Sequence, residues 1–263
     1  MDPRHVPASR RKGDTGALTM PNARGSSGFA IARLVAAALG TYMVAGTARA
    51  GADLAVTWSK SLAGPTPADL QKAASSPWDY AYDTQNYKTK ETRKVHSCAE
   101  AKELPKGFEP GTDQDLNALK TDTLRCRVME LLLTAKPAET SYVRSLALDD
   151  AALGLLPASM APTPAAEEAK KLELAAARGT TWRKQDPKLH VVKKKPEEVT
   201  IESASTRAVL TVLGRGDLNG DKLDDLVIER AGGGRKGTWS STEAFVLTRR
   251  SATGPLEIVS RLR

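Results

Sequence analysis

Four oxygen-bearing side chains lie close together in one short polar segment of this chain. They are Asp217, Asn219, Asp221 and Asp225. They stand at positions 1, 3, 5 and 9 of a loop, and the backbone carbonyl of Leu223 stands at position 7. Calcium prefers oxygen ligands, about six to eight of them. The sequence therefore predicts a divalent-cation site in this loop, with Ca²⁺ as the expected ion.

The residues around the loop indicate strands rather than helices. An EF-hand loop has Gly at position 6 and Glu at position 12, each end continuing into a helix. Here these positions hold Lys222 and Ile228, and the flanks 207–213 and 226–228 are rich in Val, Leu, Ile and Thr. Such residues favour strands. We therefore expect a strand–loop–strand site.

Residues 216–228 resemble the FG-GAP/VCBS-type repeat, whose signature is close to D-x-[DN]-G-D-G-x-x-D-L; Gly220 and Leu226 also match it. The resemblance implies a calcium loop that joins two strands, with the ligands Asp217, Asn219, Asp221, Asp225 and the carbonyl of Leu223. The motif occurs once, whereas a propeller needs at least four blades, so a whole propeller is excluded. Lys222 departs from the pattern. A positive φ there would cost about 1 kcal/mol, and its ammonium adds charge beside the cation.

Two other interpretations of the acidic loop remain open. Asn-Gly and Asp residues also favour plain β-turns. Alternatively, Asp217, Asp224 and Asp225 could hold a catalytic metal ion or act as acid–base groups. No catalytic sequence motif supports this second interpretation, and only His96 and His190 follow residue 50. We therefore predict no catalytic residue.

The first 50 residues are typical of a secretory signal peptide. An apolar run covers 34–45, arginines precede it, and Ala48 and Ala50 fit the small-x-small cleavage rule. Met20 could be the true start and would give a signal of ordinary length. We expect cleavage near Ala50 and a periplasmic or secreted protein.

Charge and hydropathy limit the possible partners. The first 50 residues hold seven of the 39 Lys and Arg residues and two of the 31 Asp and Glu residues, which leaves 32 against 29, or +3. This small excess gives nucleic-acid binding little support. No apolar run after residue 50 approaches the ~20 residues of a membrane span. A protein or glycan partner remains possible, with the aromatic segment 76–87 and the Gly-rich loop 232–237 as candidate contact surfaces.

Cys98 and Cys126 form an even pair in a chain that we expect to be exported, which predicts one disulfide. Two separate buried thiols are the alternative. A redox pair is not expected, because the spacing is not C-x-x-C.

The hydrophobic pattern predicts an α+β fold, with a helical N-terminal half and a small antiparallel sheet in the C-terminal half. Expected helices cover 67–73, 96–104, 112–134, a weak stretch at 139–160, and 164–178 with Thr163 as its cap. Expected strands cover 189–192, 199–202, 208–213, 226–228, 244–248 and 256–259. The aromatics of 76–95 are expected to pack a loop onto a small core.

These elements suggest four regions: a signal peptide (1–50), a mostly helical region with the disulfide (51–160), a bridging helix or linker (161–184) and a β region with the cation loop (185–263). We expect an exported, non-enzymatic structural or interaction module. The alternative is a secreted metal-dependent hydrolase that uses the acidic loop.

Overall fold

The computed structural model describes residues 54–237 and 239–263, which form an α+β fold, as the sequence predicts. The predicted signal peptide lies outside the described residues. Within the described part, no helix has the length and apolar character needed to cross a membrane.

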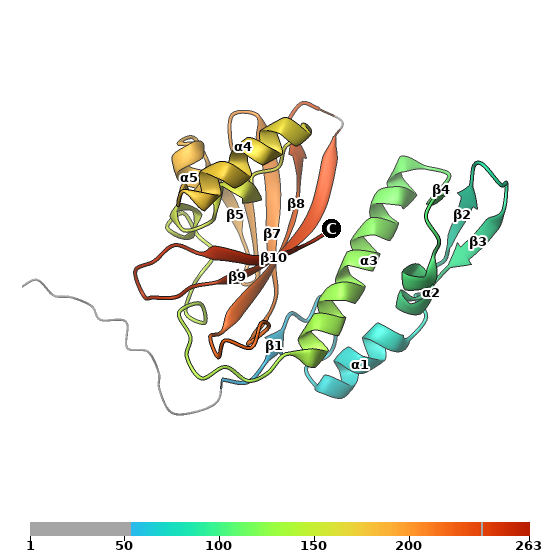
Figure 1. The fold of residues 1–263 in the computed structure, drawn as a ribbon, viewed down its shortest axis with the longest axis horizontal. Helices are drawn as coiled ribbons and strands as arrows, with labels where there is room; N and C mark the ends of the chain where they lie inside the picture. The colour runs from blue at the N-terminus through green and yellow to red at the C-terminus, as the bar shows by residue number, and fades with distance from the viewer. Residues whose placement is uncertain (1–53, 238) are drawn as a thin grey trace, which may run out of the picture. The chain divides into compact units, whose positions relative to one another are not determined.

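An antiparallel sheet fills the C-terminal half (Figure 1). Its strands follow one another in space in the order β10-β9-β8-β7-β6-β5. They are β5 (His190–Lys194), β6 (Glu198–Glu202), β7 (Thr206–Gly216), β8 (Asp225–Gly234), β9 (Ser240–Thr248) and β10 (Glu257–Leu262). All six predicted strands are confirmed, and several are longer than the sequence indicates. In β8, for example, Gly232–Gly234 continue the strand rather than form a loop.

A seventh strand comes from the start of the described chain. β1 (Thr57–Trp58) pairs with the end of β7, beyond a bulge between Val212 and Gly214. A Cβ atom on Gly214 would lie 2.9 Å from the Thr57 carbonyl oxygen and 2.6 Å from Leu132. Glycine therefore allows β1 and the helix that carries Leu132 to approach β7 closely.

The N-terminal half also contains a second, small sheet that the sequence analysis missed. It consists of β2 (Tyr82–Asn86), β3 (Thr92–Val95) and β4 (Phe108–Pro110), in the order β3-β2-β4. The segment expected to be a loop is therefore largely a hairpin. These strands are short and polar, so their alternation gives a weak signal.

Three helices of the N-terminal half match their predictions closely. They are α1 (Pro67–Ser75), α2 (Cys98–Glu103) and α3 (Asp113–Thr134). Each begins after a hydroxyl side chain that accepts a backbone N–H: Thr66, Ser97 or Thr112. Such caps satisfy N–H groups that the first helical turn leaves free.

In the middle of the chain, the predicted helix over 139–160 and the predicted cap at Thr163 were wrong, whereas the predicted helix over 164–178 is confirmed. The stretch 139–160 holds only two short 3-10 helices, η1 (Ala152–Gly154) and η2 (Ala158–Met160). Part of its backbone bonds to the acidic loop instead of forming helical turns. Helix α4 (Ala166–Ala177) begins two residues later than expected, and Thr163 does not cap it. The short helix α5 (Trp182–Gln185) follows.

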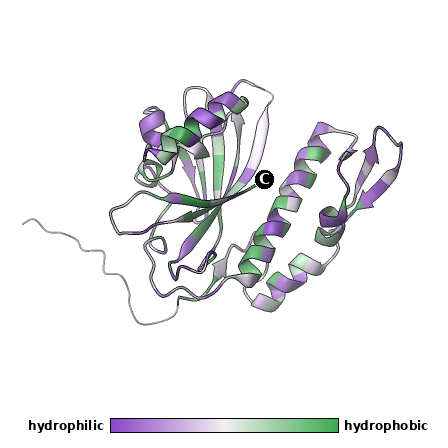
Figure 2. Ribbon diagram, viewed as in Figure 1, coloured by the Kyte–Doolittle hydropathy of each residue, from purple (hydrophilic) through white to green (hydrophobic). Residues whose placement is uncertain are grey.

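The main sheet is hydrophobic on both faces. Neighbouring residues of a strand point to opposite sides, so consecutive apolar residues supply both faces. In β8, Leu226 and Ile228 belong to a core with Trp182 and the 143–160 segment, whereas Val227 belongs to a second core with α3. Figure 2 shows this hydrophobic character along the strands. Strand β8 is thus packed on both faces, and the acidic loop ends at its first residue, Asp225.

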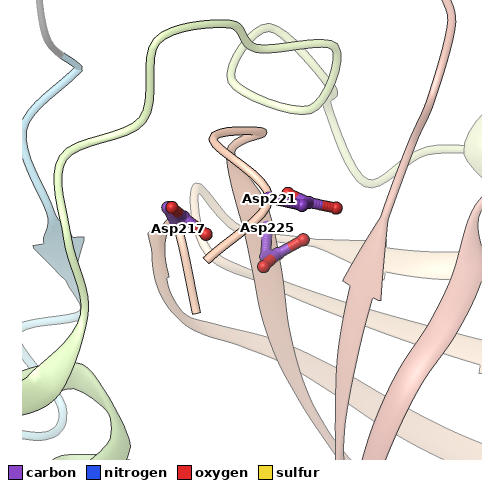
Figure 3. Close-up of side chains that lie close together, drawn as sticks. All are labelled: Asp217, Asp221 and Asp225. Atoms are coloured by element: carbon purple, nitrogen blue, oxygen red, sulfur yellow. The ribbon is translucent and has the colours of Figure 1, made fainter. Parts of the chain in front are cut away.

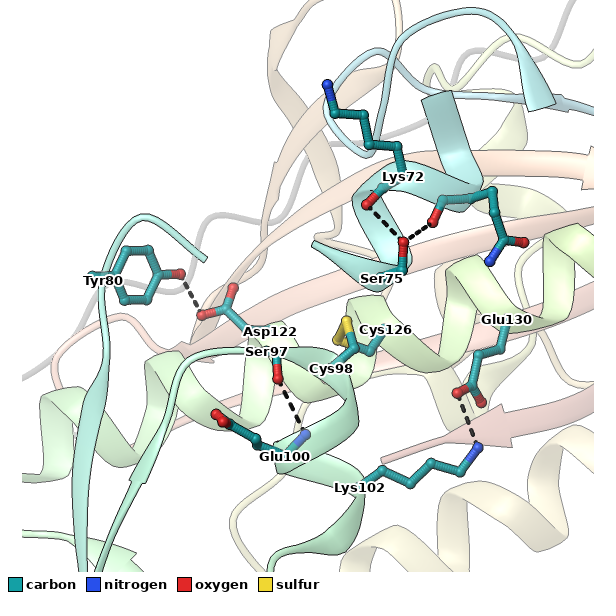
Figure 4. The surroundings of a disulfide bond; sticks show 11 residues. Lys72, Ser75, Tyr80, Ser97, Cys98, Glu100, Lys102, Asp122, Cys126 and Glu130 are labelled. Carbon is teal, nitrogen blue, oxygen red and sulfur yellow. Dashed lines mark hydrogen bonds and ion pairs between the residues drawn. A yellow bond between two sulfur atoms is a disulfide. The ribbon is translucent and has the colours of Figure 1, made fainter. Parts of the chain in front are cut away.

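The predicted disulfide is present. Cys98 at the start of α2 and Cys126 in α3 are bonded, with 28 residues of separation and a Cα–Cα distance of 5.5 Å (Figure 4). The bond ties α2 to the helix that covers one face of the main sheet.

Candidate metal centre

The acidic loop is the connection of the β7–β8 hairpin, as predicted. Gly216 pairs with Asp225 at its base. Residues 136–140 run alongside the loop. The N–H groups of Lys136 and Asp217 bond to each other's carbonyl oxygens at 3.0 and 2.9 Å, and the carbonyl of Lys222 accepts two more N–H groups. The loop is therefore fixed from outside as well as by its own strands.

Three of the predicted ligands come together in this loop. Oxygen atoms of Asp217, Asp221 and Asp225 lie within 4.8 Å of one another (Figure 3). Asp217 and Asp225 are buried, whereas Asp221 is exposed. Asp217 accepts the N–H groups of Gly220 at 2.7 Å and Lys222 at 3.1 Å, which folds the loop around its carboxylate.

Asp225 is the least satisfied of these carboxylates. It is fully buried, and its Oδ2 accepts the Leu218 N–H at 3.0 Å. Its Oδ1 is also buried and has no hydrogen-bond partner among the described residues. Burial, and to a lesser degree the charges of Asp221 and Asp217, raise the pKa of Asp225 to about 6, against the opposing effect of the Leu218 N–H and the Thr248 hydroxyl. An orphaned, buried carboxylate oxygen beside two further carboxylates suits a divalent cation.

The other two predicted ligands behave differently. Asn219 is exposed, and its side chain already bonds to Asp221: Nδ2 donates to Oδ2 at 3.2 Å, and Oδ1 accepts the N–H at 2.8 Å. Leu223 donates its N–H to Asp221 Oδ1 at 2.9 Å, and within the described chain no hydrogen bond reaches its carbonyl oxygen. That carbonyl is free for other use, but Asn219 Oδ1 would have to give up a bond.

Lys222 has the left-handed backbone that its position in the motif requires, with φ of 67°. Its ammonium pairs with Glu139 at 2.8 Å, and this hydrogen bond raises the pKa of Lys222. Both side chains are more than half exposed, so the pair adds little stability. Much of the lysine charge near the loop is nevertheless balanced by the carboxylate.

Asp224 lies beside the loop but has other partners. Arg144 binds its two oxygens at 3.0 and 3.2 Å, and the Ser141 hydroxyl donates to Oδ2 at 2.8 Å. The Asp224 carboxylate is therefore already paired, which argues against its taking part in a catalytic metal site. The sequence analysis missed Arg144, because 80 residues separate it from Asp224.

The aromatic segment divides between core and surface. Tyr82 is buried, whereas Tyr80 is half-exposed. Both hydroxyls donate to Asp122 of α3 at 2.6 Å (Figure 4 shows the bond from Tyr80). Burial, and next the bond to Asp122, raise the pKa of both tyrosines. The segment thus packs onto a small core, as expected, while the rings of Tyr80 and Tyr87 stay half-exposed.

The two histidines lie far from the acidic loop in the fold. His96 pairs with Glu100 at 2.6 Å at the start of α2, and His190 is exposed at the first position of β5. Neither is close to the three carboxylates in the described contacts. Comparisons with protein families, with curated proteins and with solved structures find no match for this chain.

Proposed function

We propose that this is an exported, non-enzymatic structural or interaction module, and that its β7–β8 loop binds one calcium ion that pins the two strands. The observation that carries the proposal is the buried Asp225 Oδ1, which has no hydrogen-bond partner in the part of the chain that the structure describes and is grouped with Asp217 and Asp221. Asp217, Asp221 and Asp225 would supply side-chain ligands and Leu223 a carbonyl. Asn219 would join after releasing the Asp221 N–H.

A calcium ion at this position would act on stability. It would neutralise three carboxylates held close together, and a ligand that binds only the folded state stabilises that state by RT ln(1 + [L]/Kd). Because the loop also bonds to residues 136–140, the ion would strengthen the contact between this segment and the sheet.

Export is supported by the disulfide, because such bonds persist in oxidising compartments. The half-exposed Tyr80 and Tyr87 offer a surface for a protein or glycan partner.

A metal-dependent hydrolase is the second candidate, and the raised pKa of Asp225 favours it, since catalytic acids often show such shifts. We prefer the structural role because four cavities of about 300–680 Å³ in the described residues are lined entirely by residues outside 217–225.

Thermal unfolding tests the proposal. The full chain, freed of metal with a chelator, should melt at a higher temperature in calcium than in equal magnesium. Asp221→Asn should lose this shift, whereas Asp79→Asn, at an exposed aspartate before β2, should keep it. An equal shift in both variants, or none in the unaltered chain, would overturn the proposal. Calcium-dependent hydrolysis of a phosphate ester or glycan that Asp221→Asn abolishes would favour the hydrolase.

A further inference from the structure

A second charged site, rich in arginine, lies where the start of α4 meets strands β8–β10. Its cavity has a volume of about 300 Å³ and is lined by Arg230, Arg261, Arg263 and Glu243 among others. Three arginines against one glutamate give these lining side chains a formal charge of +2. Glu173 on α4 pairs with Arg261 at 3.0 Å and reduces the local excess to +1.

Arg230 is the most buried of these cations, with 2% of its surface exposed. It donates to the Met160 carbonyl at 3.1 Å, to the Ser241 hydroxyl at 3.0 Å and to Glu243 at 2.6 Å. Its Nε, like that of Arg261, is buried without an acceptor among the described residues. Burial, opposed by Glu243 and assisted by the charges of Arg261 and Arg263, lowers the pKa of Arg230 to about 10. Glu243 and Glu173 together balance two of the three arginines, so one positive charge and the two buried Nε donors remain without a partner among the described residues.

The first turn of α4 adds further donors to the same cavity. Ala165 and Ala166 line it, and no side chain caps this helix. The N–H groups of residues 166–168 therefore lack intrahelical partners. Two carboxylates, Glu167 and Glu168, belong to that turn, and Glu168 accepts the Thr163 hydroxyl at 2.6 Å. A helix N-terminus favours a negative charge and presents N–H groups to it.

We propose that this cavity binds a phosphate group, either as free phosphate or as the terminal group of a small molecule. Guanidinium forks match phosphate oxygens, and the helix N-terminus supplies N–H donors to the same anion. The volume lies at the lower end of the range for ligand pockets, about 300–1,000 Å³, which suits a small ligand. The inference does not depend on calcium in the acidic loop.

The test is a calorimetric titration of the full chain with inorganic phosphate, at constant ionic strength and without calcium. Saturable binding is expected, and glycerol phosphate should bind at least as tightly if the group belongs to a larger molecule. Arg263→Gln should weaken phosphate binding about tenfold or more, because a charge-assisted hydrogen bond is lost. The Arg263 side chain is 62% exposed, so the variant should fold. Arg261→Gln serves as a second variant.

Arg250→Gln is the matched control. Arg250 is 60% exposed and pairs with Glu257 at 3.0 Å, much as Arg263 pairs with Glu243 at 2.9 Å, but it does not line the cavity. This variant should bind phosphate as the unaltered chain does. The proposal fails if phosphate does not saturate, if acetate binds as tightly, or if all three variants bind equally.

Discussion

Replacing Asp225 with asparagine should stabilise the metal-free protein at neutral and higher pH. The carboxyl is fully buried, and burial raises its pKa from the ordinary 3.8 to about 6. A pKa raised by folding means that the ionised form destabilises the fold. The stabilising contribution is complete below the unfolded pKa near 4, and it is lost as the pH rises through 6.

The size of the effect follows from the shift. A rise from 3.8 to about 6 corresponds to about 3 kcal/mol at pH 8, since one pKa unit is worth about 1.4 kcal/mol. Asparagine removes the charge and retains an oxygen for the Leu218 N–H. We expect a gain of about 1–3 kcal/mol at pH 8 and almost none at pH 3.5.

Urea unfolding in a chelator, at pH 8 and pH 3.5, measures this difference. At pH 8, saturating calcium should make the unaltered chain more stable than Asp225→Asn. The unaltered chain gains about 4.1 kcal/mol at a calcium concentration of 1,000 Kd, which exceeds the advantage of the variant, whereas Asp225→Asn gains little.

Asp224→Asn is the control for this prediction. Asp224 is equally buried but fully paired with Arg144 and Ser141. Removing its charge should destabilise the protein by about 1.5–3 kcal/mol, with or without calcium, because Arg144 and Ser141 lose hydrogen bonds to a charged group. If Asp225→Asn is also less stable than the unaltered chain in chelator at pH 8, the reasoning from the orphaned carboxylate is wrong.

Three further predictions concern the elements around the loop. Serine at Cys98 and Cys126 should lower the free energy of unfolding by about 3–4 kcal/mol, measured against the oxidised chain. Arg125→Met leaves the buried Glu229 unpaired and should cost about 3–5 kcal/mol in urea unfolding; no loss would show that water compensates. Lys222→Gly should tighten calcium binding about two- to fivefold in a titration, since it removes a positive charge near the site; weaker binding would contradict this.

Local patterns were sufficient to predict much of this fold. Helix α3 has a threonine cap and apolar residues at helical spacing, and β5–β10 are runs rich in β-branched residues between turn residues. The disulfide followed from an even cysteine count. In each case the signal lies within one element, so neighbouring residues determine the structure.

Features that depend on distant contacts were missed. The strands β2–β4 are short and polar, and β4 ends in Pro110, so only their packing beside α3 reveals them. Thr163 looked like a helix cap, but its hydroxyl donates to the Glu168 carboxylate instead. In the candidate site, the spacing gave the three aspartates. It could not give the orphaned oxygen of Asp225, which arises from tertiary burial.

The most direct test of the calcium loop is a calorimetric titration of calcium into the metal-free full chain, with the double variant Asp217→Ala/Asp221→Ala as control. We predict saturable binding of one calcium ion per chain, weaker binding of magnesium, and no binding to the double variant. No saturable heat up to millimolar calcium, or equal binding by the double variant, would contradict the account and leave the loop as a β-turn.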